Sequence, residues 1–372
     1  MNILIISNNY PSDNNPSYGA FVYNLVQELA KDNKITVITP QRFHKLTLKK
    51  GIGYGKERCQ IIRPVYFSFS DRSILGFKTF FFTEMMYKKS VVESLKRLKE
   101  KPDVIYTHFF KNARPVLDYS EKNKIPLVVA SGESTYDYWF KIPKDIHKKM
   151  FTQINHIICV SQGNKEKLVE LGFDENKMTV VPNAVDYSLF RPLNKKSCKE
   201  RLGLSTTKFT IGFIGHFIHR KGPNRIIKAI EMLGDENIEL VCVGNRGELL
   251  KNSFTTVLNP RPNYQLPEIY NAFDVFVLPT LNEGHCNVIE EAKACAIPII
   301  SSKGTTVEGQ IDSEVGILVD PLKVDEIAES IALLKSDNKL RDLMSYNLKK
   351  RAGDYGIEQR ARKINEILSE FV

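Results

Sequence analysis

The sequence contains no long apolar run. Within its 372 residues, no stretch approaches the roughly 18 consecutive apolar residues that a membrane-spanning helix needs. Met1-Asn2-Ile3 leads directly into an apolar segment, without the basic start and the cleavage site of a secretory signal. These absences predict a cytoplasmic protein and argue against an integral membrane protein.

Signals for disulfides, metals and repeats are also missing. The six cysteines include no Cys-x-x-Cys pair, and several lie in apolar segments, as buried free thiols do. His216 and His219 lack the carboxylate neighbours and the helical placement of a zinc site. We find no internal repeat of 20 to 50 residues and no low-complexity segment. We therefore expect no disulfide bond, no metal and no cofactor.

What the chain does have is enough apolar residues for two cores. Hydrophobic residues make up 42% of the sequence, and 372 residues suggest two domains of about 150 to 200 residues each. Short apolar runs alternate with segments of helical spacing, which predicts an α/β protein with parallel, doubly wound sheets. We expect strands at residues 2–7, 35–39, 103–107, 127–130, 157–160, 209–214, 239–243, 274–278 and 298–301.

The alternation restarts after residues 180–193, and a hinge is expected at residues 183–195. The predicted domains are residues 1–187 and 188–354. Residues 355–372 have helical spacing and form a predicted C-terminal helix.

The net charge of +10 is unevenly distributed. Residues 1–190 hold 28 Lys and Arg against 19 Asp and Glu, so +9 of the +10 lies in the N-terminal half. Such an excess favours an anionic partner, either nucleic acid or a membrane with acidic lipids. Because no nucleic-acid-binding motif is present, we favour an anionic membrane surface, with a merely basic surface as the alternative.

Residues 77–101 begin with aromatic side chains and end with lysines. Such a helix can lie in a membrane interface, with its cations on lipid headgroups, or it can pack its apolar side on the sheet. Both interpretations stay open. Residues 42–58, a basic stretch with glycines, are a candidate for a mobile loop.

Glu283 and Glu291 are the most informative residues of the chain. They lie between a predicted strand that ends at Leu278 and another that begins at Pro298, with a helix expected from about Cys286. Glu283 would then lie in the loop before the helix, and Glu291 about a turn and a half inside it. The two carboxylates would face one cleft from different depths.

A helix N-terminus between these glutamates can bind a phosphate. Its unpaired N–H groups and its dipole attract anions, so the backbones of Gly284, His285 and Cys286 could bind one, with Asn287 beside them. A phosphate flanked by two hydroxyl-binding carboxylates describes a nucleotide sugar. The alternative is an ordinary acidic start to a helix.

Three segments carry a resemblance to the retaining glycosyltransferases of family 4, and the resemblance extends over nearly the whole chain. They are the segment from Glu283 to Glu291, GFIGHFIHRKG at residues 212–222 and PNAVDYSLFRP at residues 182–192. The resemblance implies the GT-B fold, with two Rossmann-like domains, an inter-domain cleft and a C-terminal helix that crosses back to the first domain. It implies that Glu283 binds the donor hexose and that Glu291 binds the nucleotide ribose.

The family's phosphate-binding turn maps onto the segment from Gly215 to Gly222. Lys221 matches the family's lysine and, with Glu283, is the predicted catalytic pair. The family's arginine is replaced by His216, which weakens the phosphate clamp unless Arg220 reaches in or the phosphates protonate the imidazole.

The N-terminal half shows one match and several departures. Gly19 matches a glycine that lets the first loop approach the sugar and phosphate closely. Ser131 stands where many members have a histidine near the sugar, and Glu133 could contact donor or acceptor or cap the next helix. His108 is a second acceptor-side candidate. Ala296, in the other half, stands where glycine is common.

These features predict a retaining, metal-independent glycosyltransferase that extends a surface polysaccharide or a lipid-linked glycan. The chain has no Asp-x-Asp, the metal-diphosphate motif of the other large glycosyltransferase fold. We favour a UDP-sugar over a GDP-sugar as donor, and a glycan or polyprenyl-diphosphate-linked acceptor at the inner face of the plasma membrane. The alternatives are a nucleotide-sugar 2-epimerase and a non-catalytic nucleotide-sugar-binding partner.

Overall fold

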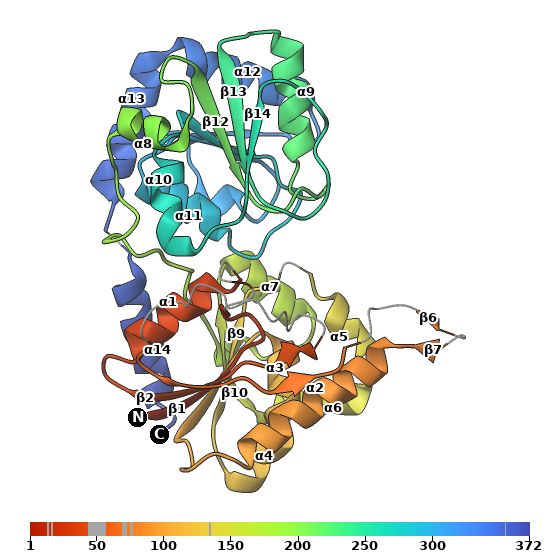
Figure 1. The fold of residues 1–372 in the computed structure, drawn as a ribbon. Helices are drawn as coiled ribbons and strands as arrows, with labels where there is room; N and C mark the ends of the chain where they lie inside the picture. Colours follow the sequence, from red (N-terminus) through yellow and green to blue (C-terminus); the bar gives the residue numbers. More distant parts are fainter. Residues whose placement is uncertain are drawn as a thin grey trace. The chain divides into compact units, whose positions relative to one another are not determined.

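The computed structural model describes residues 1–12, 15, 18–43, 57–68, 73–74, 77–133, 135–353 and 355–372. Most of the loop candidate at 42–58 therefore lies outside the described residues. The chain divides into two compact units (Figure 1). Unit 1 comprises Met1–Pro182 and Glu358–Val372, and unit 2 comprises Asn183–Ile357.

Unit 1 is built on a seven-stranded parallel sheet with the order β11-β10-β9-β8-β1-β2-β4. Its central strands are apolar runs buried on both faces, as parallel sheets require. The order places the carboxyl ends of β1, β8 and β9 side by side. The strands are β1 (Asn2–Ile6), β2 (Lys34–Ile38), β4 (Gln60–Ile62), β8 (Val104–His108), β9 (Leu127–Ser131), β10 (Ile154–Cys159) and β11 (Met178–Val180).

Helices flank this sheet, and two short strand pairs accompany it. The helices are α1 (Ala20–Leu29), α2 (Phe80–Leu95), α3 (Phe110–Ala113), α4 (Leu117–Asn123), α5 (Asp137–Lys141), α6 (Lys144–Gln153), α7 (Gln162–Glu170) and α14 (Ile357–Ser369). Single 3-10 turns are Arg114–Val116 and Glu175–Lys177. The pairs are β3 (Gln41–Arg42) with β5 (Val65–Tyr66), and β6 (Ser73–Ile74) with β7 (Phe77–Lys78).

Helix α2 settles part of the question left open by residues 77–101. It buries Tyr87, Val91 and Leu95 in the core of unit 1 and exposes Phe81 and Phe82. Packing on the sheet is therefore confirmed for one side, while the aromatic start stays accessible. In the described ranges, no helix combines the length and hydropathy of a membrane span.

The C-terminal helix α14 is part of unit 1. Asn365 on this helix accepts a hydrogen bond from the side-chain amide of Asn33, just before β2, at 2.8 Å. The chain thus returns to its N-terminal half after completing unit 2.

Unit 2 is built on a six-stranded parallel sheet with the order β14-β13-β12-β15-β16-β17. Helices connect β12 to β13, β14 to β15 and β15 to β16. The strands are β12 (Phe209–Ile214), β13 (Ile238–Val243), β14 (Thr255–Leu258), β15 (Val275–Leu278), β16 (Ile299–Ser302) and β17 (Gly316–Val319). The helices are α8 (Lys195–Leu202), α9 (Pro223–Leu233), α10 (Leu266–Tyr270), α11 (Asn287–Ala294), α12 (Val324–Ser336) and α13 (Asn338–Arg351), with 3-10 turns at Asn263–Gln265 and Glu308–Gln310.

Candidate functional site

Two loops of unit 2 bring the predicted donor residues together. One connects β12 to α9 and the other connects β15 to α11. Because β12 and β15 are parallel neighbours, both loops leave the sheet at the same edge, where ligands of open α/β sheets bind. The amide of Leu281 donates to the carbonyl of Arg220 at 2.8 Å and joins the loops directly.

Arg220, Lys221 and Glu283 form one ion cluster. The Lys221 Nζ lies 2.5 Å and an Arg220 guanidinium nitrogen 2.7 Å from the same oxygen, Oε1 of Glu283. The Thr280 hydroxyl donates to that oxygen at 2.9 Å. The Lys221 and Glu283 side chains are 13% and 11% exposed. Two cations thus share one carboxylate, which leaves a local excess of positive charge that suits a phosphate.

His216, at the position of the family's arginine, lies among cationic side chains. Partial burial lowers its pKa, and the charges of Arg246, Lys221 and Arg220 lower it further. Arg220 instead stands beside Lys221 on the Glu283 carboxylate. Of the two outcomes that the sequence left open, the structure therefore favours Arg220 as the second cation.

Helix α11 begins where the sequence predicted, with Cys286 as its N-cap. Gly284, His285 and Asn287 flank this residue in the chain, and the His285 side chain is 8% exposed. The amide of Cys286 donates to the side chain of Gln310 at 2.9 Å. One of the three amides predicted to bind phosphate is therefore already engaged by the protein.

Glu291 lies deep in α11 and is 8% exposed. Its two oxygens accept hydrogen bonds from the side-chain amide of Asn263 at 2.7 Å and from the hydroxyl of Tyr270 at 2.8 Å. Burial raises the pKa of Glu291 to about 7, and the two hydrogen bonds oppose this shift. The carboxyl group therefore changes charge near neutral pH.

Several residues that hold the two glutamates were not predicted from the sequence. Thr280 and Thr306 hold Glu283, the first through the carboxylate and the second through the main chain. Asn263 and Tyr270 hold Glu291. Thr280 could have been anticipated, because it lies just beyond the end of a predicted strand. The others reach the site through loops and a short helix that no periodicity marks.

In unit 1, Gly19 allows the main chain of another segment to approach closely. It has a φ of 76°, and a Cβ there would lie 2.4 Å from the carbonyl oxygen of Asn9 and 2.6 Å from the nitrogen of Tyr10. The close approach seen in the structure is thus to the loop after β1. Any larger residue would displace that loop.

His108, the last residue of β8, is buried, at 2% exposure. Its ring lies 5.0 Å from the ring of Tyr106 and 6.2 Å from that of Phe21, centroid to centroid. Burial lowers its pKa to about 3, and the charge of Arg360 contributes. The imidazole is therefore neutral and enclosed, which suits a core residue better than a group that a substrate reaches.

Glu133 caps a helix, although not the next one. Its carboxylate accepts from the amide of Phe110 at 2.9 Å, from the amide of Gly132 at 3.0 Å and from the Ser131 hydroxyl at 2.7 Å. Phe110 begins α3, which precedes Glu133 in the chain. Of the two roles left open for Glu133, a cap on the following helix is wrong. Parallel β8 and β9 place the two loops together, and the carboxylate accepts from the start of the earlier helix.

The architecture is shared with solved glycosyltransferase structures. The structure of HepE from Anabaena in complex with UDP-glucose is similar with a TM-score of 0.77, at 16% identity, and the match covers 100% of each chain. Two Rossmann-like units with parallel sheets, together with this likeness, define a protein of the GT-B fold.

Two family models identify the family. Residues 19–189 match the model described as Glycosyltransferase Family 4, and residues 194–351 match Glycosyl transferases group 1. The chain belongs to glycosyltransferase family 4.

Two relatives are similar over most of their length. The UDP-Gal:alpha-D-GlcNAc-diphosphoundecaprenol alpha-1,3-galactosyltransferase of Escherichia coli is 28% identical over 316 residues, 76% of this chain and 80% of that protein. TuaC of Bacillus subtilis strain 168, whose name assigns it to teichuronic acid biosynthesis, is 28% identical over 347 residues, 89% of this chain and 88% of that protein.

Proposed function

We propose that the protein is a retaining, metal-independent glycosyltransferase that moves a hexose or an N-acetylhexosamine from a UDP-sugar to a glycan or polyprenyl-diphosphate-linked acceptor of a surface polysaccharide. The observation that carries this proposal is the ion cluster of Arg220, Lys221 and Glu283. Its two cations sit at the edge of the sheet where a donor diphosphate would bind, next to the first turn of α11.

The cations would stabilise the leaving group. As the bond between the anomeric carbon and the phosphate oxygen breaks, its electron pair passes to the diphosphate, and Arg220 and Lys221 offset the charge that develops there. The acceptor hydroxyl attacks from the same face and gives its proton to the departing phosphate oxygen. Attack from the face of departure retains the anomeric configuration.

The two glutamates would divide the rest of the donor. Glu283, in the loop, would bind hydroxyls of the transferred sugar once the diphosphate draws Arg220 and Lys221 away from its carboxylate. Glu291, deeper in α11, would accept hydrogen bonds from the ribose hydroxyls with the oxygen lone pairs that Asn263 and Tyr270 leave.

The similar proteins support the choice of substrates. HepE was solved with UDP-glucose, and the E. coli relative is named for a UDP-galactose donor and a diphosphoundecaprenol acceptor. We therefore propose a UDP-sugar in preference to a GDP-sugar, and an acceptor attached to a polyprenyl diphosphate.

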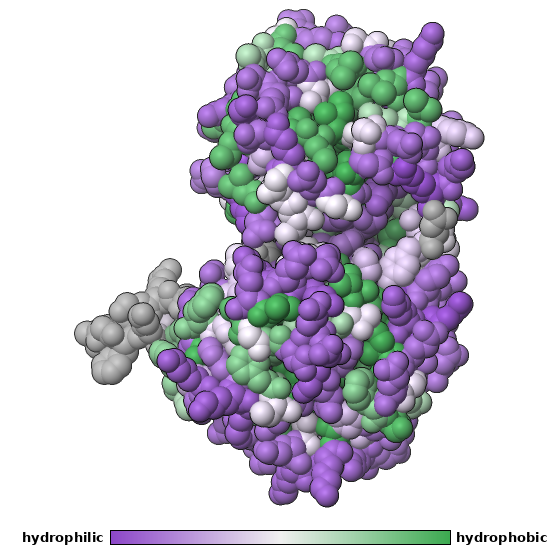
Figure 2. Space-filling model, turned by 180° about the vertical axis from the view of Figure 1, so that it is seen from behind, coloured by the Kyte–Doolittle hydropathy of each residue, from purple (hydrophilic) through white to green (hydrophobic). Residues whose placement is uncertain are grey.

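A lipid-linked acceptor suits the surface of unit 1. The described phenylalanines that are exposed all lie in this unit, and they are Phe43, Phe67, Phe81, Phe82 and Phe140. Apolar patches are visible between polar side chains on its face in the lower part of Figure 2. Exposed aromatic side chains on a basic domain suit an anionic membrane, so we propose a peripheral location on the inner face of the plasma membrane.

A thermal-shift panel of UDP-, GDP- and ADP-sugars tests the donor, because a ligand at 100 times its dissociation constant adds about 2.7 kcal/mol of stability. We expect a shift with UDP-sugars. Incubation of the responding donor with and without a lipid-diphosphate acceptor then tests the reaction. Transfer with retention supports the proposal, conversion to the 2-epimer without acceptor indicates an epimerase, and binding with neither reaction indicates a non-catalytic partner.

A further inference from the structure

We propose that Arg225 is a positioning residue of the donor site, which fastens the loop carrying Arg220 and Lys221 to the loop carrying Glu283. The inference rests on the proposed function of that site. Arg225 is the third residue of α9 and is 9% exposed. It belongs to none of the three segments that carry the family resemblance.

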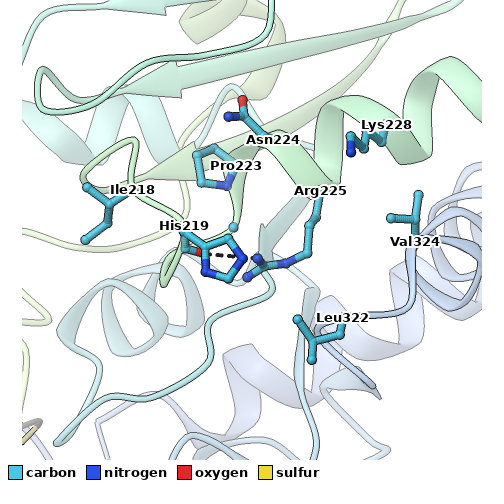
Figure 3. A pocket seen from close by; sticks show the side chains of 9 residues that line it. Ile218, His219, Pro223, Asn224, Arg225, Lys228, Leu322 and Val324 are labelled. Carbon is cyan, nitrogen blue, oxygen red and sulfur yellow. Dashed lines mark hydrogen bonds between the residues drawn. The ribbon is translucent and has the colours of Figure 1, made fainter.

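The Arg225 guanidinium bonds to both loops at once. One terminal nitrogen donates to the carbonyl of His219 at 2.9 Å, and the other donates to the carbonyl of Pro279 at 2.6 Å. Figure 3 shows the Arg225 side chain running from α9 to His219. His219 directly precedes Arg220, and Pro279 opens the segment that leads to Glu283. Because the guanidinium is planar and rigid, it fixes the spacing of the two main chains.

Gly222 shows how closely the loops and this side chain are packed. It has a φ of 77°, and a Cβ there would lie 2.5 Å from an Arg225 guanidinium nitrogen and 2.5 Å from the Pro279 carbonyl oxygen. The loop between β12 and α9 therefore packs directly against the Arg225 guanidinium. Loss of the guanidinium would leave two carbonyls without their charge-assisted donor and would loosen the placement of Lys221 relative to Glu283.

A pocket of about 360 Å³ borders this side chain (Figure 3). Ile218, Leu322 and Val324 contribute to its walls, and Arg225 and His219 line it as well. If Arg225 is shortened to alanine, a small planar cation can therefore reach the two carbonyls from solution. Chemical rescue by guanidinium becomes a test of position that loss of stability alone does not mimic.

Arg341 offers a matched control in the same unit. It also donates to two main-chain carbonyls, those of Leu334 and Lys335 near the end of α12, and it lies 5.3 Å from the ring of Phe209. Its bonds involve neither donor loop. Arg341→Met therefore reports what the loss of a carbonyl-binding arginine does to unit 2 in general.

The test compares the UDP affinity of each variant, measured by calorimetry, with its melting temperature. Arg225→Met should weaken UDP binding about tenfold or more, whereas Arg341→Met should change it little at a comparable loss of melting temperature. Arg225→Lys should fall between, because an ammonium group lacks the planar fork. Arg225→Ala should regain UDP affinity with methylguanidinium well below denaturing concentrations, while Arg341→Ala should not.

The outcomes separate the two claims. If wild-type protein binds UDP and Arg225→Met binds it equally well, or loses no more affinity than Arg341→Met, the positioning role is wrong. If Arg225→Met does not fold, the other two variants decide. The positioning role is wrong if Arg225→Lys binds UDP as tightly as wild type does, or if methylguanidinium does not restore UDP binding to Arg225→Ala. If wild-type protein binds no UDP, the proposed function itself fails.

Discussion

Units 1 and 2 share a parallel-sheet design but use the ends of their strands differently. In unit 2, Arg220, Lys221 and Glu283 meet across two loops, and their charges do not balance. In unit 1, the acceptor-side candidates are engaged by the protein itself: Glu133 accepts a hydrogen bond at the start of α3, and His108 is buried. Unit 2 therefore carries a cluster of unbalanced charged side chains at its strand ends, while the described exposed phenylalanines all lie in unit 1.

The largest expected effect tests the role of Glu283 in unit 2. Removing a charged hydrogen-bond partner costs about 1.5 to 3 kcal/mol, so Glu283→Gln should lower turnover roughly ten- to a hundredfold when the bond tightens in the transition state. UDP should bind no more weakly, because Arg220 and Lys221 lose their internal competitor. Steady-state kinetics and calorimetry measure both effects, with exposed Glu231→Gln as the control. A loss of UDP affinity in Glu283→Gln would reverse the assignment.

Glu291→Gln should instead weaken UDP, by about tenfold. Because burial raises the pKa of Glu291 to about 7 and ribose hydroxyls bind the ionised form better, wild-type affinity should rise as the pH increases through 7. The variant should lack this contribution to the pH dependence. Calorimetry at pH 6 and pH 8 checks it; identical pH slopes for the two proteins would contradict the ribose role.

Ionisation of Glu291 also affects stability. Its folded pKa lies above the ordinary value of 4.5, so the native state retains the proton to higher pH than the unfolded chain does. The contribution of this group to stability is therefore lost as the pH rises from about 4.5 through 7. Urea unfolding of wild type and Glu291→Gln across this range should show a smaller pH dependence in the variant.

A smaller effect sharpens the contrast in surface character. Serine at both Phe81 and Phe82 should reduce cosedimentation with phosphatidylcholine–phosphatidylglycerol vesicles several-fold, and salt should weaken wild-type binding as well. Serine at Met232 and Leu343, which are 66% and 55% exposed in unit 2, is the matched control. Equal binding to neutral vesicles, or an equal loss in the control, would rule out docking through this part of unit 1.

The smallest expected effect concerns the backbone of unit 2. Ala296 follows α11 with a φ of 58°, a left-handed conformation that favours glycine. Ala296→Gly should therefore stabilise the protein, by up to about 1 kcal/mol after the entropy cost of glycine is subtracted. Gly234 follows α9 with a similar φ of 59°, so the opposite substitution can be compared there. Gly234→Ala should destabilise the protein. Urea titration compares them; a destabilised Ala296→Gly would contradict the strain.

The sequence predicts the centre of each sheet better than its edges. All nine predicted strands are present among the described residues. The unpredicted strands of the two large sheets, β4, β11, β14 and β17, are their outermost strands, and the short pairs β3–β5 and β6–β7 were not predicted either. An edge strand is covered on one side only and is partly exposed, as in Thr255–Leu258, so its residues need not form a continuous apolar run. Periodicity therefore carries too little signal to find it.

Site residues follow the same logic. The placement of Glu283 and Glu291 around the start of a helix could be predicted from the two flanking apolar runs, and the resemblance to the family pointed to Lys221. The partners of these residues could not, since Asn263, Tyr270 and Thr306 reach them through tertiary contacts between loops and helices that are distant in the chain. The hydrogen bond from the Phe110 amide, at the start of α3, to Glu133 likewise depends on the pairing of β8 with β9.

Titration of UDP into wild-type protein, Lys221→Ala and Lys228→Ala tests the central claim, that the cations at the end of β12 bind a nucleotide diphosphate. Lys228 is an exposed lysine of α9 and provides a control of equal charge. We expect wild type and Lys228→Ala to bind UDP alike, and Lys221→Ala to lose about tenfold or more in affinity. If Lys221→Ala binds UDP as wild type does, the diphosphate does not lie at this cluster and the account is wrong.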